Sequence, residues 1–182
     1  MHILRESSRK LTGFAVNKNP LRLNVGFLIA QPVGNSRPFP FEFEEIQIAE
    51  DLTLRQFQGE AIIGRTPQGL LVQGKFQGLL SLECVRCLEP YDHLLQWEFT
   101  ELYAFRRKAT ENDLILPEDA HIDIRPLLRE YALLEIPINP ICSPDCKGLC
   151  PVCGVNLNVT QCDHRTQTED SPFAALKALL EE

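Results

Sequence analysis

Seven cysteines, arranged in two clusters, constrain this sequence more than any other feature. One C-x2-C pair, Cys84 and Cys87, lies in the middle of the chain. The second cluster contains Cys142, Cys146, Cys150, Cys153 and Cys162, and His164 follows two residues later. The first residues contain no apolar stretch typical of a secretory signal, so we expect a reducing, cytoplasmic environment. There, an odd number of cysteines favours metal ligands over disulfides.

The cysteine spacing is typical of zinc sites. A tight C-x2-C turn presents two thiolates to one ion, and a structural zinc ion takes four such ligands in a tetrahedron. Seven cysteines and His164 supply eight candidate ligands, which is the number that two closed sites need. Order along the chain favours Cys84, Cys87, Cys142 and Cys146 for one site and Cys150, Cys153, Cys162 and His164 for the other.

Two other interpretations fit the same residues. Both C-x2-C pairs together could hold a single zinc ion in a ribbon-like site, which would leave Cys142, Cys146 and Cys162 spare. Alternatively, the thiols serve redox chemistry. In either zinc arrangement, four protein ligands leave no open coordination position for a reactive water. We therefore expect one or two zinc ions with a structural role.

Apolar residues with a period of two predict a run of β-strands. Alternation is clear over 41–50 and continues less regularly over 52–65. In the next strand, 70–83, Gly74 and Gly78 indicate a bend, a bulge or a close approach of the backbone. Aromatic residues occupy one face of 91–105, so these two strands form an antiparallel hairpin with its cysteines at the 84–90 tip.

A helix follows the strands after a polar connection over 106–121. Ile124, Leu127, Leu128, Tyr131 and Leu134 recur at helical spacing, and Asp123 is a plausible N-cap. A second, short helix is expected from Ser171 onwards. The fold class is thus α+β: a mainly antiparallel curved sheet or partial barrel, a following helix and a C-terminal zinc-binding segment. We divide the chain into a basic segment 1–40, a β-rich domain 41–136 and a cysteine-rich segment 137–182.

Charge is distributed unevenly along the chain. The whole chain carries a net charge of −7, but residues 1–40 carry six cations and one acid, a net of +5. The remaining residues therefore carry −12. This balance argues against indiscriminate binding to nucleic acid or to an anionic membrane, and any RNA contact should be local. No nucleophile elbow, phosphate-binding loop or HExxH motif is present, so we expect no enzyme activity.

The chain resembles the YceD family, the large ribosomal RNA subunit accumulation proteins. The resemblance lies in PFEFE, GLLVQGKFQGLLSLECVRCLEP, EFTELYAF, IDIRPLLREYALLEIPINPICSPDCKGLCPVCGVNLN and SPFAALKALL, between about residues 38 and 182. It implies a bacterial or plastid factor in large-subunit biogenesis that supports accumulation of 23S rRNA. The family's two cysteine motifs correspond to the two clusters above. Members often end the second motif with C-x-C, where this chain has Cys162-Asp163-His164.

Three functional hypotheses remain. The first is a zinc-stabilised assembly factor that contacts 23S rRNA or a precursor particle through the basic segment and Arg106, Arg107 and Lys108. Trp97, Tyr103 and Phe105 would then stack on unpaired bases, unless they are core residues. The second is an acidic module that binds a basic ribosomal protein. The third is a thiol redox sensor.

Overall fold

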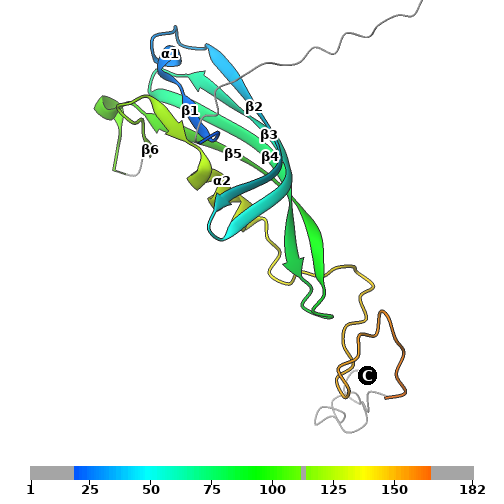
Figure 1. Cartoon of the computed structure of the whole chain (residues 1–182). Coiled ribbons are helices and arrows are strands. Elements are labelled where there is room, and N and C mark those ends of the chain that lie inside the picture. The colour runs from blue at the N-terminus through cyan, green and yellow to red at the C-terminus, as the bar shows by residue number, and fades with distance from the viewer. Residues whose placement is uncertain (1–18, 112–113, 165–182) are drawn as a thin grey trace, which may run out of the picture.

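A computed structural model describes residues 19–111 and 114–164 of the chain. The short helix expected from Ser171 and the first eighteen residues of the basic segment lie outside the described residues. The elements, in chain order (Figure 1), are β1 (Arg22–Asn24), α1 (Gly26–Ile29), β2 (Ser36–Ala49), β3 (Leu52–Arg65), β4 (Gly69–Glu83), β5 (Pro90–Ala104), the 3-10 helix η1 (Arg106–Lys108), β6 (Leu114–Ile115), β7 (His121–Asp123) and α2 (Arg125–Leu134).

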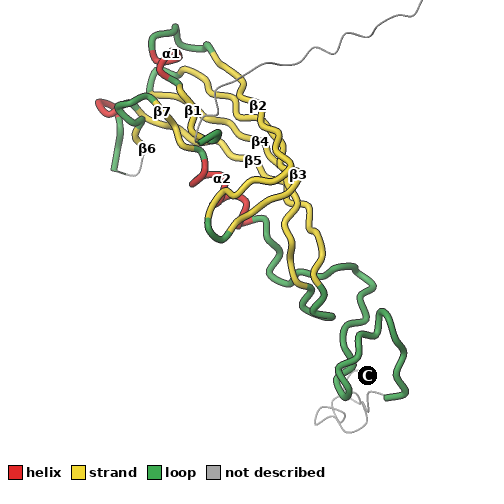
Figure 2. Tube along the Cα trace, in the orientation of Figure 1, coloured by secondary structure: helices red, strands yellow, loops and turns green. Residues whose placement is uncertain are grey.

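The main sheet is a meander of four long strands with one short addition. Its order is β2-β3-β4-β5-β6, so strands that follow each other in sequence are neighbours in space. The first four strands are antiparallel, whereas β6 runs parallel to β5. The sheet is open, with β2 and β6 at its edges, and is not closed into a barrel (Figure 2). The expected α+β class with a mostly antiparallel sheet and a following helix is confirmed.

Aromatic side chains on one face of the sheet form the centre of the core. Phe57, Phe76 and Trp97 come from three adjacent strands, and the rings of Phe57 and Phe76 lie 5.5 Å apart between centroids. Trp97 is 4% exposed and Tyr103 is 8% exposed. The hypothesis that Trp97 and Tyr103 stack on unpaired bases is therefore wrong, because the period of two in β5 places them in the core. Phe105 lies just after β5 and is half-buried against the same core.

The two glycines of β4 have separate roles. A Cβ atom at Gly74 would lie 2.6 Å from the Phe99 ring, so only glycine lets that ring lie flat on the strand. Gly78 lies opposite an irregularity in β3, where the register shifts between Arg55 and Gln58. Gln56, inside that irregularity, has a φ of 49°. The expected bulge thus lies in the neighbouring strand rather than in β4 itself.

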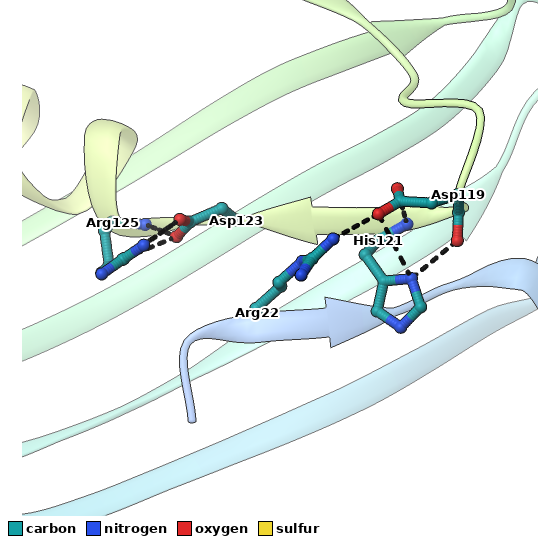
Figure 3. Close-up of polar contacts among 5 residues, drawn as sticks. All are labelled: Arg22, Asp119, His121, Asp123 and Arg125. Carbon is teal, nitrogen blue, oxygen red and sulfur yellow. Dashed lines mark hydrogen bonds and ion pairs between the residues drawn. The ribbon is translucent and has the colours of Figure 1, made fainter. Parts of the chain in front are cut away.

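The helix α2 covers part of the sheet and packs against β5 and β2. It begins at Arg125 with Ile124 as its N-cap, so the expectation of an Asp123 cap is wrong. Asp123 nevertheless accepts a hydrogen bond from the Arg125 backbone N–H at 3.0 Å and pairs with its guanidinium (Figure 3). In the described part of the chain, no helix combines the length and the apolar character needed to cross a membrane.

Residues just before the main sheet also contribute to its core. The strand β1 pairs with β7, and Arg22 forms an ion pair with Asp119 beside that pairing (Figure 3). Leu21, Val25 and Leu28 are buried in the same cluster as Phe57. Part of the segment that carries the N-terminal positive charge is therefore anchored in the core.

The long hairpin β4–β5 separates two ends of the molecule. Its pairing runs without interruption from Gly69 and Ala104 to Glu83 and Pro90. Fourteen steps at about 3.3 Å span about 46 Å. The cysteine-bearing tip lies at one end, and α1 and η1 lie at the other (Figure 1).

Candidate metal centres

The tip of the β4–β5 hairpin is held against the cysteine-rich segment by backbone hydrogen bonds. The Val85 N–H donates to the Pro140 carbonyl at 2.9 Å, and the Leu149 N–H donates to the Arg86 carbonyl at 3.0 Å. The Arg86 guanidinium donates to the Cys146 carbonyl at 3.0 Å. These contacts join two segments that are more than fifty residues apart in sequence, and they bring together the first four expected ligands.

The first group consists of Cys84, Cys87, Cys142 and Cys146, whose sulfur atoms all lie within 4.8 Å of one another. The Sγ atoms of Cys84 and Cys146 are 3.8 Å apart, as are those of Cys87 and Cys142. Zinc–sulfur bonds of about 2.3 Å in a tetrahedron give sulfur–sulfur edges of about 3.8 Å. A disulfide would need about 2.05 Å, and all these cysteines are free. The donor set and its spacing thus fit a zinc ion.

Electrostatics within this group favour a cation. Burial raises the pKa of Cys84, but the backbone amides of Cys142, Cys87 and Arg86 outweigh it and lower that pKa to about 6. Burial and the sulfur atoms of Cys146, Cys84 and Cys87 raise the pKa of Cys142 to about 12. The thiolate form is thus favoured at Cys84, whereas Cys142 resists ionisation. A divalent cation removes this conflict because it neutralises the sulfurs together.

The second group consists of Cys150, Cys153, Cys162 and His164, whose ligand atoms also lie within 4.8 Å of one another. Cys150 is buried, whereas Cys153 and His164 are exposed. The backbone amides of Cys153 and Val152 lower the pKa of Cys150 to about 6. Three sulfurs and one imidazole also form a donor set that suits zinc. This group could hold a metal ion in a more open setting than the first.

The two C-x2-C turns share one backbone geometry although their sequences differ. The residue after the second cysteine donates its N–H to the carbonyl of the first at 2.9 Å, from Leu88 to Cys84 and from Gly154 to Cys150. Both residues have a left-handed backbone, with φ of 61° at Leu88 and 71° at Gly154. In each turn, the amides two and three positions after the first cysteine face its sulfur. In each turn, the sulfur of the first cysteine therefore lies against two backbone N–H groups, which favour its thiolate form.

Asn158 is a site residue that the sequence analysis missed. Its Nδ2 donates to the Cys146 sulfur at 3.3 Å, and its Oδ1 accepts the Lys147 N–H at 2.8 Å. The first bond lowers the pKa of Cys146. Asn158 lies between Cys153 and Cys162 in sequence, so it links the second group to the first. Its sequence signal was weak, because an asparagine near cysteines is ordinary in a turn.

All eight expected ligands therefore lie in two groups of four, divided as chain order suggests. The two C-x2-C pairs lie in different groups, and the described residues do not bring them together as a ribbon-like site requires. The binding of a metal, and its identity as zinc, stay predictions.

Comparison with known proteins identifies the family. Residues 72–180 match the family model described as "Large ribosomal RNA subunit accumulation protein YceD". The chain belongs to the YceD family. No solved structure matches this YceD-family chain.

Relatives of this YceD-family member occur in bacteria and plants. An uncharacterized protein of Mycobacterium tuberculosis is 36% identical over 118 residues, which cover 62% of this chain and 56% of the relative. The chain thus spans little more than half the length of the mycobacterial relatives that it matches. YlbN of Bacillus subtilis is 28% identical over 78% of this chain and 89% of its own length. A chloroplastic YCED homolog 1 of Arabidopsis thaliana, named a large ribosomal RNA subunit accumulation protein, is 41% identical over 36% of this chain and 21% of its own.

Proposed function

We propose that this chain is a non-enzymatic, zinc-stabilised factor that supports accumulation of 23S rRNA during biogenesis of the large ribosomal subunit. Its site of action would be the cytoplasm of a bacterium or the corresponding compartment of a plastid. The observation that carries the proposal is the family match over 72–180, because the family is described by a role in accumulation of large-subunit rRNA. That description names no reaction.

The two cysteine groups support a stabilising role for the metal. Residues 137–164 contain no helix or strand, so this segment has little regular structure of its own. A structural zinc ion contributes about 10–16 kcal/mol to folding in small peptide systems. In this chain, the first ion would fix the segment to the β4–β5 tip, and the second would close the loop that follows. With four protein ligands each, neither ion would have a free position for catalysis.

Deletion and complementation in a bacterium that carries this gene tests the proposal. Deletion should lower the ratio of 23S to 16S rRNA, and the intact chain should restore it. A double variant, Cys84→Ser and Cys87→Ser, should restore less, because the β4–β5 tip would lose its anchor. A Ser81→Ala variant, three residues away on the exposed side of β4, serves as the matched control. An unchanged ratio after deletion would contradict the proposal.

A second candidate is an acidic module that binds a basic ribosomal protein. A hollow of about 790 Å³ on the sheet has acids in excess of bases along its lining. Its charged residues are Glu42, Glu98, Glu135 and Lys75, and its aromatic residues are Phe41, Phe76 and Trp97. Carboxylates around an apolar floor suit a lysine- or arginine-rich segment. Pull-down with and without nuclease distinguishes the candidates. A ribosomal protein retained after nuclease treatment favours this module, and its loss with the RNA favours direct RNA contact.

A further inference from the structure

The end of the sheet opposite the cysteines gathers three segments of the chain. These are 25–37, 64–68 and 104–108, which we call the basic end. The Arg65 N–H donates to the Asn35 carbonyl at 2.7 Å, and the Phe105 N–H donates to the Gln68 carbonyl at 3.0 Å. The Lys108 ammonium donates to the Pro67 carbonyl at 2.7 Å. The three segments thus form one continuous surface around α1 and η1.

Charge distinguishes this surface from the rest of the molecule. The three segments carry Arg37, Arg65, Arg106, Arg107 and Lys108 and no aspartate or glutamate, in a chain of net charge −7. Arg106 pairs with Glu118 at 3.1 Å, and this carboxylate comes from outside the three segments. Four cations remain after that pair is subtracted. These three segments therefore carry an excess of positive charge, although the chain as a whole is acidic.

The cations of the basic end divide into internal and available groups. The Arg65 guanidinium lies 4.4 Å from the centre of the Phe105 ring and donates to the Ile29 carbonyl. It therefore joins the three segments of the basic end to one another. Arg37 and Arg107 are exposed, and neither forms an ion pair among the described residues. They are free to meet an anion.

An exposed aromatic ring lies beside one of the available cations, Arg37. Phe27, on α1, is 42% exposed, and the Arg37 guanidinium carbon lies 5.6 Å from the centre of its ring. Val33, in the following loop, is 57% exposed. A flat ring next to a guanidinium suits an unpaired base and its phosphate, because bases stack on aromatic and guanidinium planes. A purely acidic peptide such as polyglutamate would pair with the cations but offers no flat partner for the ring.

We propose that the basic end is a contact surface for single-stranded RNA, in which Arg37 and Arg107 bind phosphates and Phe27 stacks on a base. This inference rests on the proposed function, and it specifies single-stranded RNA as the molecule that the protein contacts. It places the RNA contact at the opposite end of the β4–β5 hairpin from the cysteine groups, and the paired strands between them are about 46 Å long when measured along the strand. The acidic middle of the sheet repels phosphate, so the contact is confined to this end.

Salt-titrated binding to a fluorescent 20-nucleotide oligouridine tests the proposal, with the full zinc-loaded chain. The intact chain should bind, with log Kd rising linearly with log salt concentration. The double variant Arg37→Gln and Arg107→Gln should weaken binding roughly tenfold at low salt and reduce the salt slope by about 1.4, since each single-strand phosphate contact contributes about 0.7. The matched control, Lys75→Gln and Lys147→Gln, removes the same charge from exposed positions elsewhere and should change Kd less than about twofold.

A Phe27→Leu variant separates stacking from charge. It should weaken binding severalfold and leave the salt slope unchanged, because no phosphate contact is lost. Equal losses in the two double variants, or no effect of Phe27→Leu, would overturn the proposed surface. Competition by polyglutamate as strong as that by RNA would overturn it in favour of an acidic protein partner.

The RNA-contact surface and the role in 23S rRNA accumulation can be refuted independently of each other. A chain that restores the 23S to 16S ratio but does not bind oligouridine refutes the RNA surface alone. A chain that binds through the basic end while its deletion leaves the 23S level unchanged refutes the role in accumulation alone.

Discussion

Gly154 and Leu88 occupy the same position in the two C-x2-C turns, and both have a left-handed backbone. A Cβ atom added at Gly154 would meet no heavy atom within 4 Å, so substitution there changes only the backbone preference. A non-glycine residue in this conformation costs about 1 kcal/mol. Comparing the zinc affinities of the wild-type chain and a Gly154 variant therefore isolates the contribution of turn geometry to metal binding.

We predict that Gly154→Ala lowers the zinc affinity of the second group about fivefold, which corresponds to about 1 kcal/mol. Competition with a fluorescent zinc chelator measures this affinity. Gly64→Ala is the matched control, because its nearest neighbour would be 3.8 Å from the new Cβ and its φ is not positive. An effect of similar size in both variants would show that the turn geometry does not matter.

The Asn158 side chain contacts the first group directly, so we predict that its substitution weakens metal binding there. Asn158→Ala removes the N–H that points at the Cys146 sulfur and should lower the zinc affinity of the first group 10- to 100-fold, the range typical of residues that support a ligand. Asn158→Asp keeps an acceptor for the Lys147 N–H but places a carboxylate beside the sulfur. The aspartate variant should therefore bind zinc no better than the alanine variant. A wild-type affinity in the aspartate variant would show that only the Lys147 contact matters.

At the scale of elements, the two groups differ in exposure. Three of the four ligands in the first group are buried, and only one of the four in the second is buried. The first group is also joined to the rigid β4–β5 hairpin, whereas the second lies within a segment that has no helix or strand. Chelators reach exposed ligands first, so the two sites should release metal at different rates.

We predict that EDTA removes metal in two kinetic phases, the faster from the second group, as followed by a metal-sensitive dye. The single tryptophan, Trp97, is buried in the sheet and reports on its core. Its emission should not shift during either phase, because Trp97 lies in a hydrophobic cluster separate from the one that contains Cys84, Cys87 and Cys146. A red shift that accompanies metal loss would show that the sheet and the metal sites unfold together.

Periodicity predicted the larger elements well. The alternation of apolar residues identified β2 to β5, and helical spacing identified α2, because each of these elements buries one face over ten or more residues. The β1–β7 pair could not be predicted, since two three-residue strands leave no periodic signal and meet only in three dimensions. The N-terminus of α2 was misplaced because a carboxylate near a helix start can bond to the helix without capping it.

The division of the metal ligands was predictable for a different reason. A C-x2-C turn holds both of its cysteines in one site, and chain order then assigns the remaining ligands. The spacing did not predict which other residues form hydrogen bonds with the ligand cysteines. Arg86 reaches the Cys146 carbonyl only because the hairpin tip docks on the cysteine-rich segment, and Asn158 reaches the Cys146 sulfur only because that segment folds back on itself. Likewise, the basic end is assembled from three separate segments, each of which looks ordinary alone.

At the scale of the whole molecule, the two ends of the protein differ in their chemistry. One end carries the two groups of candidate zinc ligands, and the other carries exposed cations beside an exposed ring. The sheet between them sets their separation, and its acidic surface would limit the proposed RNA contact to one end. The proposed metal sites are central, because they would fix the only large part of the described chain that has no helix or strand.

Native mass spectrometry of the purified chain tests this account most directly. We predict that the intact protein carries two zinc ions. We further predict that Cys87→Ser removes one ion, that Cys153→Ser removes the other, and that the two substitutions together remove both. A single zinc ion in the intact chain, lost completely with either substitution, would contradict the account and favour one site held by both C-x2-C pairs.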